Sequence, residues 1–190
     1  MAVLQLRRRD ADPLTRALDE QRVAVVVPAA GAGTRMGEGV AKQYLELAGK
    51  PILVHTLEHL SEVSEVDEIV IAVPKKDVTS VRHLTVHYRI PKIEAIIPGG
   101  SKRQDSVWNC LQYLADRNID IVLIHDGVRP FFTPGLLTAV CKEALNSGAA
   151  IPVVPVMDTV KQVGKEGFVS STLNREELVL AQRWLSGQGP

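Results

Sequence analysis

The chain has 190 residues, of which 45% are hydrophobic and 23% are charged. This length is typical of one domain whose core is stable without disulfides or metals. Lys and Arg together number 22, as do Asp and Glu, so no overall positive field favours a nucleic-acid partner. No apolar run approaches the roughly 20 residues that a membrane-spanning helix needs. We therefore expect a cytoplasmic enzyme domain that binds neither nucleic acid nor membrane.

Residues 1–21 mix the basic run Arg7-Arg-Arg9 with acidic residues at positions 10, 12, 19 and 20. This composition indicates a flexible, solvated N-terminal extension, and a nucleic-acid-binding arm is the alternative. Cys110 and Cys141 lack metal-ligand spacing and lie in apolar, helix-like segments. They fit buried thiols in a reducing cytoplasm.

Strand-like and helix-like segments alternate along the chain after this extension. Short, β-branched apolar runs predict buried strands, and apolar residues at helical spacing predict the helices between them. The alternation predicts an α/β fold with a mostly parallel, twisted sheet, helices on both faces and right-handed crossovers. In such folds ligands bind at the carboxyl ends of the strands. The expected strands are 23–27, 68–73, 93–97, 121–125 and 149–156, and the expected helices are 51–63, 76–84, 101–116 and 134–145.

The first expected strand is followed by the loop Pro28-Ala-Ala-Gly-Ala-Gly-Thr-Arg-Met-Gly37 and by Ala41-Lys-Gln-Tyr44. Its glycines allow a tight turn that brings backbone N–H groups close to an anion, and Arg35 and Lys42 add positive charge. The spacing fits neither a P-loop, which needs Lys-Ser or Lys-Thr, nor a dinucleotide fingerprint, which needs Gly-x-Gly-x-x-Gly. The loop therefore indicates a polyphosphate site, with a purely structural turn as the alternative.

The third expected strand ends in Pro98-Gly-Gly-Ser-Lys-Arg-Gln-Asp-Ser106. Ser101 is placed to cap the helix that follows, and Lys102 and Arg103 lie in its first turn. Cations at this position oppose the helix dipole, so the pattern favours a bound anion over helix stability alone. We expect Lys102, Arg103 and Ser106 to face a ligand, and a solvated basic turn is the alternative.

The fourth expected strand ends in His125-Asp-Gly-Val-Arg-Pro130. A carboxylate at the tip of a central strand, next to cations, suits Mg²⁺ or a ribose or polyol hydroxyl, so Asp126 is a candidate for either, and a turn cap is the alternative. Arg129 offers a planar guanidinium that can hold a phosphate with two hydrogen bonds. His125 fits a packed strand histidine better than a catalytic base.

These loops together resemble those of the 2-C-methyl-D-erythritol 4-phosphate cytidylyltransferases, nucleotidyltransferases of the non-mevalonate isoprenoid pathway. The resemblance runs from about Val23 to Gln182 and also includes Pro155-Val-Met-Asp-Thr-Val-Lys161. It implies a Rossmann-like nucleotidyltransferase fold with a projecting β-arm at about 156–176. It also implies that CMP is transferred from CTP to 2-C-methyl-D-erythritol 4-phosphate and that pyrophosphate is released. Ribitol-5-phosphate cytidylyltransferases share most of the pattern, so another polyol phosphate is the alternative acceptor.

The resemblance also implies a role for each loop. Arg35 and Lys42 would be the catalytic cations, and Asp126 would bind Mg²⁺, the expected divalent cofactor. The arm would join two copies in a homodimer and reach the acceptor of the neighbouring copy. The implied nucleotide-binding residues are Pro28, Ala29, Ala30, Gly31, Ala32, Gly33, Gly100, Ser101, Arg103 and Ser106. The implied acceptor-binding residues are Asp126, Arg129, Thr159, Lys161 and Arg175.

After Gln182 the chain departs from the family's pattern. The family continues with Thr-Pro-Gln and a longer section that holds a second metal-binding aspartate, whereas this sequence continues with Arg183-Trp-Leu-Ser-Gly-Gln-Gly-Pro190. We expect residues 183–190 to be a non-matching tail, produced by truncation or a frameshift, outside a domain of residues 22–182. An inactive remnant that still binds CTP is therefore a further alternative.

Overall fold

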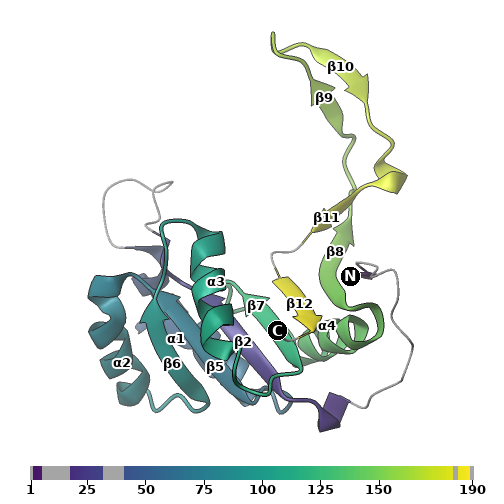
Figure 1. The fold of residues 1–190 in the computed structure, drawn as a ribbon. Coiled ribbons are helices and arrows are strands. Elements are labelled where there is room, and N and C mark those ends of the chain that lie inside the picture. Colours follow the sequence, from purple (N-terminus) through teal and green to yellow (C-terminus); the bar gives the residue numbers. More distant parts are fainter. Residues whose placement is uncertain (1, 6–17, 32–40, 182–183, 189–190) are drawn as a thin grey trace.

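The computed structural model of the chain describes residues 2–5, 18–31, 41–181 and 184–188. These residues form an α/β fold in which helices cover both faces of an eight-stranded sheet, and a two-stranded arm projects from one side (Figure 1). The strand order is β1-β8-β12-β7-β2-β5-β6, with β11 paired to β8. Within the described residues, no helix is long and apolar enough to cross a membrane.

All predicted helices and strands are present, and their ends lie within three residues of the expected positions. The helices are α1 (Ile52–Glu62), α2 (Val78–His87), α3 (Arg103–Leu114) and α4 (Pro134–Ser147). The corresponding strands are β2 (Val23–Pro28), β5 (Glu68–Val73), β6 (Ile93–Pro98), β7 (Ile121–His125) and β8 (Ala149–Pro155). Strands β6, β5, β2 and β7 are adjacent in this order and run parallel to one another, which confirms the predicted parallel core of the sheet.

The central strand β2 explains why the sheet is covered on both faces. Side chains alternate between the faces of a strand. Val25 therefore packs in the core on one side of the sheet with α1, α2 and α4, while Val26 packs on the other side with α3. Both valines are fully buried. This double burial is typical of a parallel strand and accounts for the continuous apolar run in the sequence.

Two further strands occupy segments that the sequence analysis placed outside the domain. Strand β1 (Ala2–Gln5) pairs antiparallel with β8, although it lies in the predicted flexible extension. Strand β12 (Trp184–Gln188) lies between β7 and β8, antiparallel to both, so this part of the expected tail is inside the sheet. Backbone N–H and C=O groups at strand edges need partners whatever side chains the partner carries. A segment without recognisable strand patterning can therefore complete a sheet.

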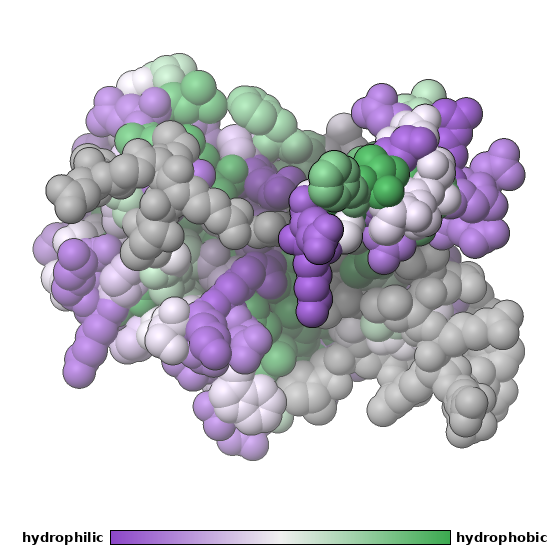
Figure 2. All heavy atoms as spheres, turned by 90° about the horizontal axis from the view of Figure 1, so that it is seen from above, coloured by the Kyte–Doolittle hydropathy of each residue, from purple (hydrophilic) through white to green (hydrophobic). Residues whose placement is uncertain are grey.

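The projecting β-arm is an antiparallel ribbon of β9 (Lys161–Val163) and β10 (Val169–Thr172). All residues of both strands are exposed. Figure 2 looks down on the molecule and shows hydrophobic side chains on the arm beside hydrophilic ones. Strand β11 (Val179–Ala181) leads the chain back to the sheet. The remaining short elements are β3 (Glu46–Leu47), β4 (Lys50–Pro51), η1 (Leu18–Glu20), η3 (Lys42–Tyr44), η4 (Lys75–Asp77) and η5 (Arg175–Glu177).

Candidate functional site

A cleft of about 450 Å³ opens where β2, β6 and β7 end. The loops after these three strands supply its walls, as expected for ligand sites at the carboxyl ends of parallel strands. Its described lining comprises Pro28, Ala29, Ala30, Gly31, Lys42, Gln43, Gly100, Ser101, Lys102, Arg103, Ser106, Asp126, Gly127 and Val128. The predicted residues Ala32, Gly33 and Arg35 lie outside the described residues.

The short helix η3 brings Lys42 to the start of the glycine-rich loop. Gln43 is 3% exposed, and its Nε2 donates a hydrogen bond of 2.9 Å to the carbonyl oxygen of Ala29. The N–H of Ala29 donates in turn to the carbonyl oxygen of Ala72 at 2.7 Å, which continues the ladder of β2. On the other side of η3, the hydroxyl of Tyr44 donates to Asp77 at 3.1 Å. The hydrogen bonds of the next two side chains, Gln43 and Tyr44, therefore hold the backbone at Lys42 in place.

Gly99 allows two loops to approach each other closely, and Gly100 allows close packing against α3. A Cβ atom at Gly99 would collide with the Cβ of Ala30 and would lie 2.7 Å from Oγ of Ser106. A Cβ atom at Gly100 would collide with the Cβ of Asp105. Gly99 therefore serves close packing between the loop after β2 and the loop after β6, which form adjoining walls of the cleft, whereas Gly100 makes room for Asp105 in the first turn of α3.

The expected cap of α3 is wrong in one respect, because Ser101 does not cap this helix. The helix begins at Arg103, and Oδ2 of Asp105 accepts hydrogen bonds of 2.9 Å from the N–H of Lys102 and from the hydroxyl of Ser101. These two donors lower the pKa of Asp105. Asp105 takes this role because the helix starts at Arg103, and a carboxylate in the first turn can reach back to the N–H just before the helix.

Asp126 connects two arginines from different loops. Its Oδ1 accepts from Nη2 and Nε of Arg103 at 2.8 and 3.1 Å, and its Oδ2 lies 3.3 Å from Nε of Arg129. The side chain of Asp126 is 14% exposed, whereas those of the arginines are 47% and 42% exposed. Arg129 is thus brought to the rim of the cleft through this ion pair, although it is not among the lining residues.

His125 is fully buried at the end of β7 and packs against Phe132, with 5.1 Å between the ring centroids. Burial lowers the pKa of His125 to about 4. The imidazole is therefore neutral near pH 7, and it lies behind the cleft instead of lining it. This position supports the interpretation of His125 as a packed strand histidine.

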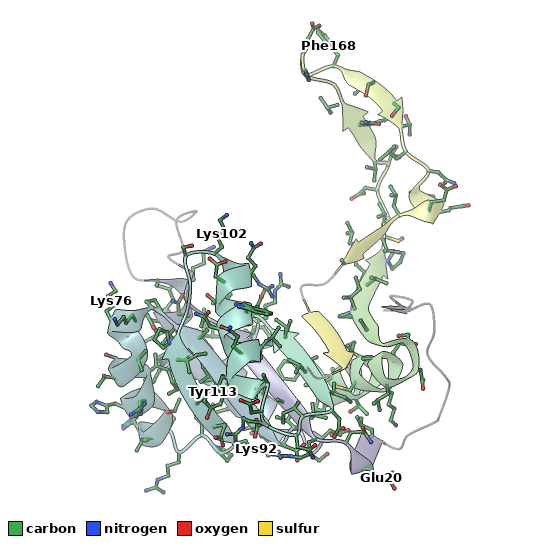
Figure 3. All side chains as sticks on the ribbon, viewed as in Figure 1. Glu20, Lys76, Lys92, Lys102, Tyr113 and Phe168 are labelled. Atoms are coloured by element: carbon green, nitrogen blue, oxygen red, sulfur yellow. The ribbon has the colours of Figure 1, made fainter. Side chains whose placement is uncertain are left out.

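The three predicted arm residues are not brought together with the cleft in a single chain. Lys161 lies in β9 of the projecting ribbon (Figure 1), Arg175 lies in η5 after β10, and Thr159 lies between β8 and β9. Nζ of Lys161 donates to Oγ1 of Thr172 at 2.7 Å, and Nη1 of Arg175 donates to the carbonyl oxygen of Met157 at 2.9 Å. Figure 3 shows the arm ending at Phe168, well away from Lys102 at the start of α3.

Several lining residues were not assigned a ligand-facing role from the sequence. Gln43, Gly127 and Val128 all lie inside motifs that the sequence analysis singled out, so their neighbours were the available signal. A Cβ atom at Gly127 would lie 3.1 Å from both the Cβ of Ala29 and Cδ1 of Leu53. Gly127 therefore lets the loop after β7 pack against the start of the glycine-rich loop and against α1.

Among the described residues, no three His, Cys, Asp or Glu side chains are grouped so that they could hold a metal ion by themselves. Asp126 is the carboxylate in the described lining. Mg²⁺ in phosphate-transfer sites commonly takes one or two carboxylate ligands and completes its shell with substrate phosphates and water. The residues present therefore fit a Mg²⁺ ion that arrives with a polyphosphate.

Comparison with known proteins gives consistent results. The sequence profile of the 2-C-methyl-D-erythritol 4-phosphate cytidylyltransferase family matches residues 23–184. A protein of this name from Syntrophus aciditrophicus is 46% identical over 162 residues, which cover 85% of this chain and 69% of the relative. One from Pelotomaculum thermopropionicum is 48% identical over 163 residues, which cover 85% of this chain and 68% of the relative. The chain thus spans about two thirds of the length of these relatives.

Solved structures support the same grouping. The 4-diphosphocytidyl-2C-methyl-D-erythritol synthase of Anaerococcus prevotii superposes with a TM-score of 0.76 at 28% identity, covering 90% of this chain and 71% of that one. The 2-C-methyl-D-erythritol 4-phosphate cytidylyltransferase of Francisella tularensis gives a TM-score of 0.67 at 31% identity, covering 86% and 71%.

Proposed function

Because the chain belongs to the 2-C-methyl-D-erythritol 4-phosphate cytidylyltransferase family, we propose that it transfers CMP from CTP to 2-C-methyl-D-erythritol 4-phosphate and releases pyrophosphate. The observation that carries this proposal is the cleft in which the glycine-rich loop, the loop after β6 and the loop after β7 meet. Lys42, Lys102 and Arg103 supply positive charge to its lining, as a triphosphate requires.

The two sides of the cleft suggest where each substrate binds. CTP would lie between the loop after β2 and the loop after β6, with its phosphates near Lys42. The acceptor would face the loop after β7, where Arg129 offers a guanidinium to its phosphate. Asp126 lies between the two, since it is paired with an arginine from each side. We expect Arg35, in the glycine-rich loop, to share the role of Lys42.

The chemistry needs positioning and charge stabilisation more than proton transfer. The nucleophile is a phosphate oxygen of the acceptor, which is already ionised at neutral pH, so no general base is required. The neutral, buried His125 is consistent with this scheme. Asp126 would bind Mg²⁺ together with the phosphates of CTP, and the ion would neutralise charge on the triphosphate when bound. Lys42 would stabilise the charge that develops as pyrophosphate leaves.

We also propose that the arm completes the site of a second copy in a homodimer. Thr159, Lys161 and Arg175 belong to the segment that includes the projecting β9–β10 ribbon (Figure 1) and are not among the lining residues of the cleft, so we infer that they contact an acceptor in a neighbouring copy. The exposed apolar side chains of the arm support this proposal, because such surfaces mark protein interfaces. They include Met157, Val163, Phe168 and Val169, each at least 57% exposed.

The proposed setting is the cytoplasm, without a nucleic-acid or membrane partner. The side chains of Cys110 and Cys141 are buried, and burial raises the pKa of Cys110 to about 12. Such thiols are inert and fit a reducing compartment.

The test of the activity is acceptor-dependent release of pyrophosphate by the purified 190-residue chain. CTP and Mg²⁺ are supplied with 2-C-methyl-D-erythritol 4-phosphate, with ribitol 5-phosphate, or with neither. We expect release with the first acceptor and at least tenfold less with the second. Faster release with ribitol 5-phosphate would reassign the acceptor. Binding of CTP without release under any condition would show an inactive nucleotide-binding chain and contradict the proposal.

A further inference from the structure

Helix α1 contacts the loop after β7 from behind the cleft. Two of its side chains, one turn apart, lie within hydrogen-bond distance of carbonyl oxygens in this loop. Oγ1 of Thr56 lies 3.1 Å from the carbonyl oxygen of Gly127, and Nδ1 of His59 lies 2.7 Å from that of Pro130. A carbonyl oxygen can only accept, so both side chains donate. The single hydroxyl hydrogen of Thr56 is shared between Gly127 and the carbonyl oxygen of Ile52, which also lies 3.1 Å from Oγ1. The two contacts therefore bracket Arg129.

The packing around these contacts leaves the loop little room to move. Thr56 is fully buried. The ring of His59 packs edge-on against Phe132, with 6.1 Å between the ring centroids. At Gly127, even a Cβ atom would press against neighbouring side chains at 3.1 Å. The backbone of the loop after β7 is thus held in place by its contacts with α1 and with the start of the glycine-rich loop.

The side chain of Arg129 itself has weaker support. It is 42% exposed, and its ion pair with Asp126 has Nε and Oδ2 3.3 Å apart. The N–H of Arg129 also donates to the carbonyl oxygen of Asp126 at 3.2 Å, closing a turn. Because exposed ion pairs contribute little to order, the position of the guanidinium depends mainly on where the backbone turn is held. That position is set by the contacts at Gly127 and Pro130.

We propose that Thr56 and His59 are positioning residues for the acceptor, because they hold the turn from which Asp126 and Arg129 face the cleft. This inference rests on the proposed function for the identity of the acceptor. Neither Thr56 nor His59 is itself a lining residue of the cleft, so each acts through the loop. Losing one such hydrogen bond should weaken acceptor binding more than CTP binding. The loops after β2 and β6 keep their own contacts, and the turn is linked to them through the ion pair of Asp126 with Arg103.

The kinetic test compares variants of three α1 residues. His59→Phe keeps an aromatic ring against Phe132 and removes the donor, whereas His59→Asn keeps a nitrogen donor near the position of Nδ1. His55→Phe is the matched control, because Nε2 of His55 makes a similar 2.8 Å contact to the carbonyl oxygen of Leu47, which does not line the cleft. Thr56→Val removes the second donor, and Thr56→Ser retains it.

We expect His59→Phe and Thr56→Val to raise the KM for the acceptor about 3- to 10-fold, the size of one net hydrogen bond. The KM for CTP should rise less than the KM for the acceptor, because the loops that would hold CTP keep their own contacts. His59→Asn, Thr56→Ser and His55→Phe should resemble the unmodified chain. Equal changes in both KM values, or none, would overturn the positioning role.

Hydrogen exchange in the free protein tests the same inference without turnover. Peptides that cover residues 126–133 should exchange faster in His59→Phe and Thr56→Val than in the unmodified chain, while peptides that cover 99–106 should not change. Unchanged exchange would overturn the inference. Faster exchange with an unchanged acceptor KM would also overturn it and leave the proposed function standing. If the unmodified chain shows no turnover, the proposed function fails, and exchange alone decides whether α1 holds the loop.

Discussion

Lys42 lies next to a buried side chain that fixes its backbone. The hydrogen bond from Gln43 to Ala29 holds η3 against the glycine-rich loop, so Lys42 reaches the cleft from an ordered support. A preorganised cation of this kind costs little reorganisation when charge develops during the reaction. Its contribution should therefore be large for turnover and small for folding.

The corresponding prediction concerns Lys42→Ala. We expect its kcat to fall by roughly 10²- to 10³-fold, as for loss of one preorganised donor, with little change in thermal stability. Steady-state pyrophosphate release and a melting curve measure both effects. Lys76→Ala is the control, because Lys76 is exposed on η4 and does not line the cleft. Normal turnover by Lys42→Ala would show that this lysine is not catalytic.

His125 should make the stability of the fold depend on pH. Burial lowers its pKa from 6.5 to about 4, so between these values the unfolded chain binds a proton that the folded chain excludes. Stability therefore falls as the pH drops from about 6.5 towards 4, by about 2 kcal/mol at pH 5.

This dependence can be isolated with His125→Leu. Urea unfolding near pH 7 and near pH 5 should show a smaller loss of unfolding free energy in this variant than in the unmodified chain. His83→Gln, which removes an exposed histidine, should retain the original dependence. An identical pH dependence in His125→Leu would contradict the lowered pKa.

At the scale of elements, the cleft depends on close contact between the loops after β2 and β6. Gly99 stands where a side chain would collide with Ala30, whereas a Cβ atom at Gly135, in the first turn of α4, would meet nothing within 4 Å. Substitutions at these two glycines therefore distinguish the effect of close loop contact from the general effect of replacing a glycine.

We expect Gly99→Ala to lower the unfolding free energy by about 1–3 kcal/mol and to weaken CTP binding, because the two loops must separate. Gly135→Ala should leave CTP binding unchanged and stability equal or slightly higher, since alanine favours a helix. Urea unfolding and calorimetric titration with CTP measure both. Equal effects at the two positions would argue against close loop contact as the reason for Gly99.

Patterns along individual elements predicted most of the fold. The apolar run of β2 is buried on both sides, and the spacing in α1 places Leu53, Leu57 and Leu60 in the core. The prediction that Ser101 caps α3 was wrong because Ser101 and Asp105 can both accept a hydrogen bond at a helix start. Which of them does so depends on the residue at which the helix begins. The pairing of β12 could not be predicted, since a sheet edge accepts backbone partners regardless of their sequence pattern.

At the scale of the whole molecule, the arm separates residues that the family resemblance assigns to one acceptor site. Arg129 lies at the cleft, and Arg175 lies at the base of the arm. If both serve one acceptor, the site must be shared between two copies. A shared site can be restored by mixing chains with different defects, because each mixed dimer contains one undamaged site.

We therefore expect Lys42→Ala and Arg175→Ala, each nearly inactive alone, to recover about a quarter of normal activity after unfolding and refolding together. Lys42→Ala refolded with Arg129→Ala is the control, since both defects lie in the cleft and every mixed site carries one of them. Recovery only in the first mixture supports the shared site. No recovery in either mixture, or a monomer by light scattering, would contradict it.

The sequence by itself determined the alternation of strands and helices, the three loops that carry chemistry and the family to which they point. It could do so because burial patterns and turn residues are local, and the loops follow directly from the strands that they end. The tertiary structure decided the pairing of Arg103 and Arg129 with Asp126, the support from Thr56 and His59, and the place of β12. Apart from the pair of Arg129 with Asp126, which are three residues apart, these contacts join residues that are distant along the chain. Their geometry therefore exists only once the sheet has brought its strand ends together.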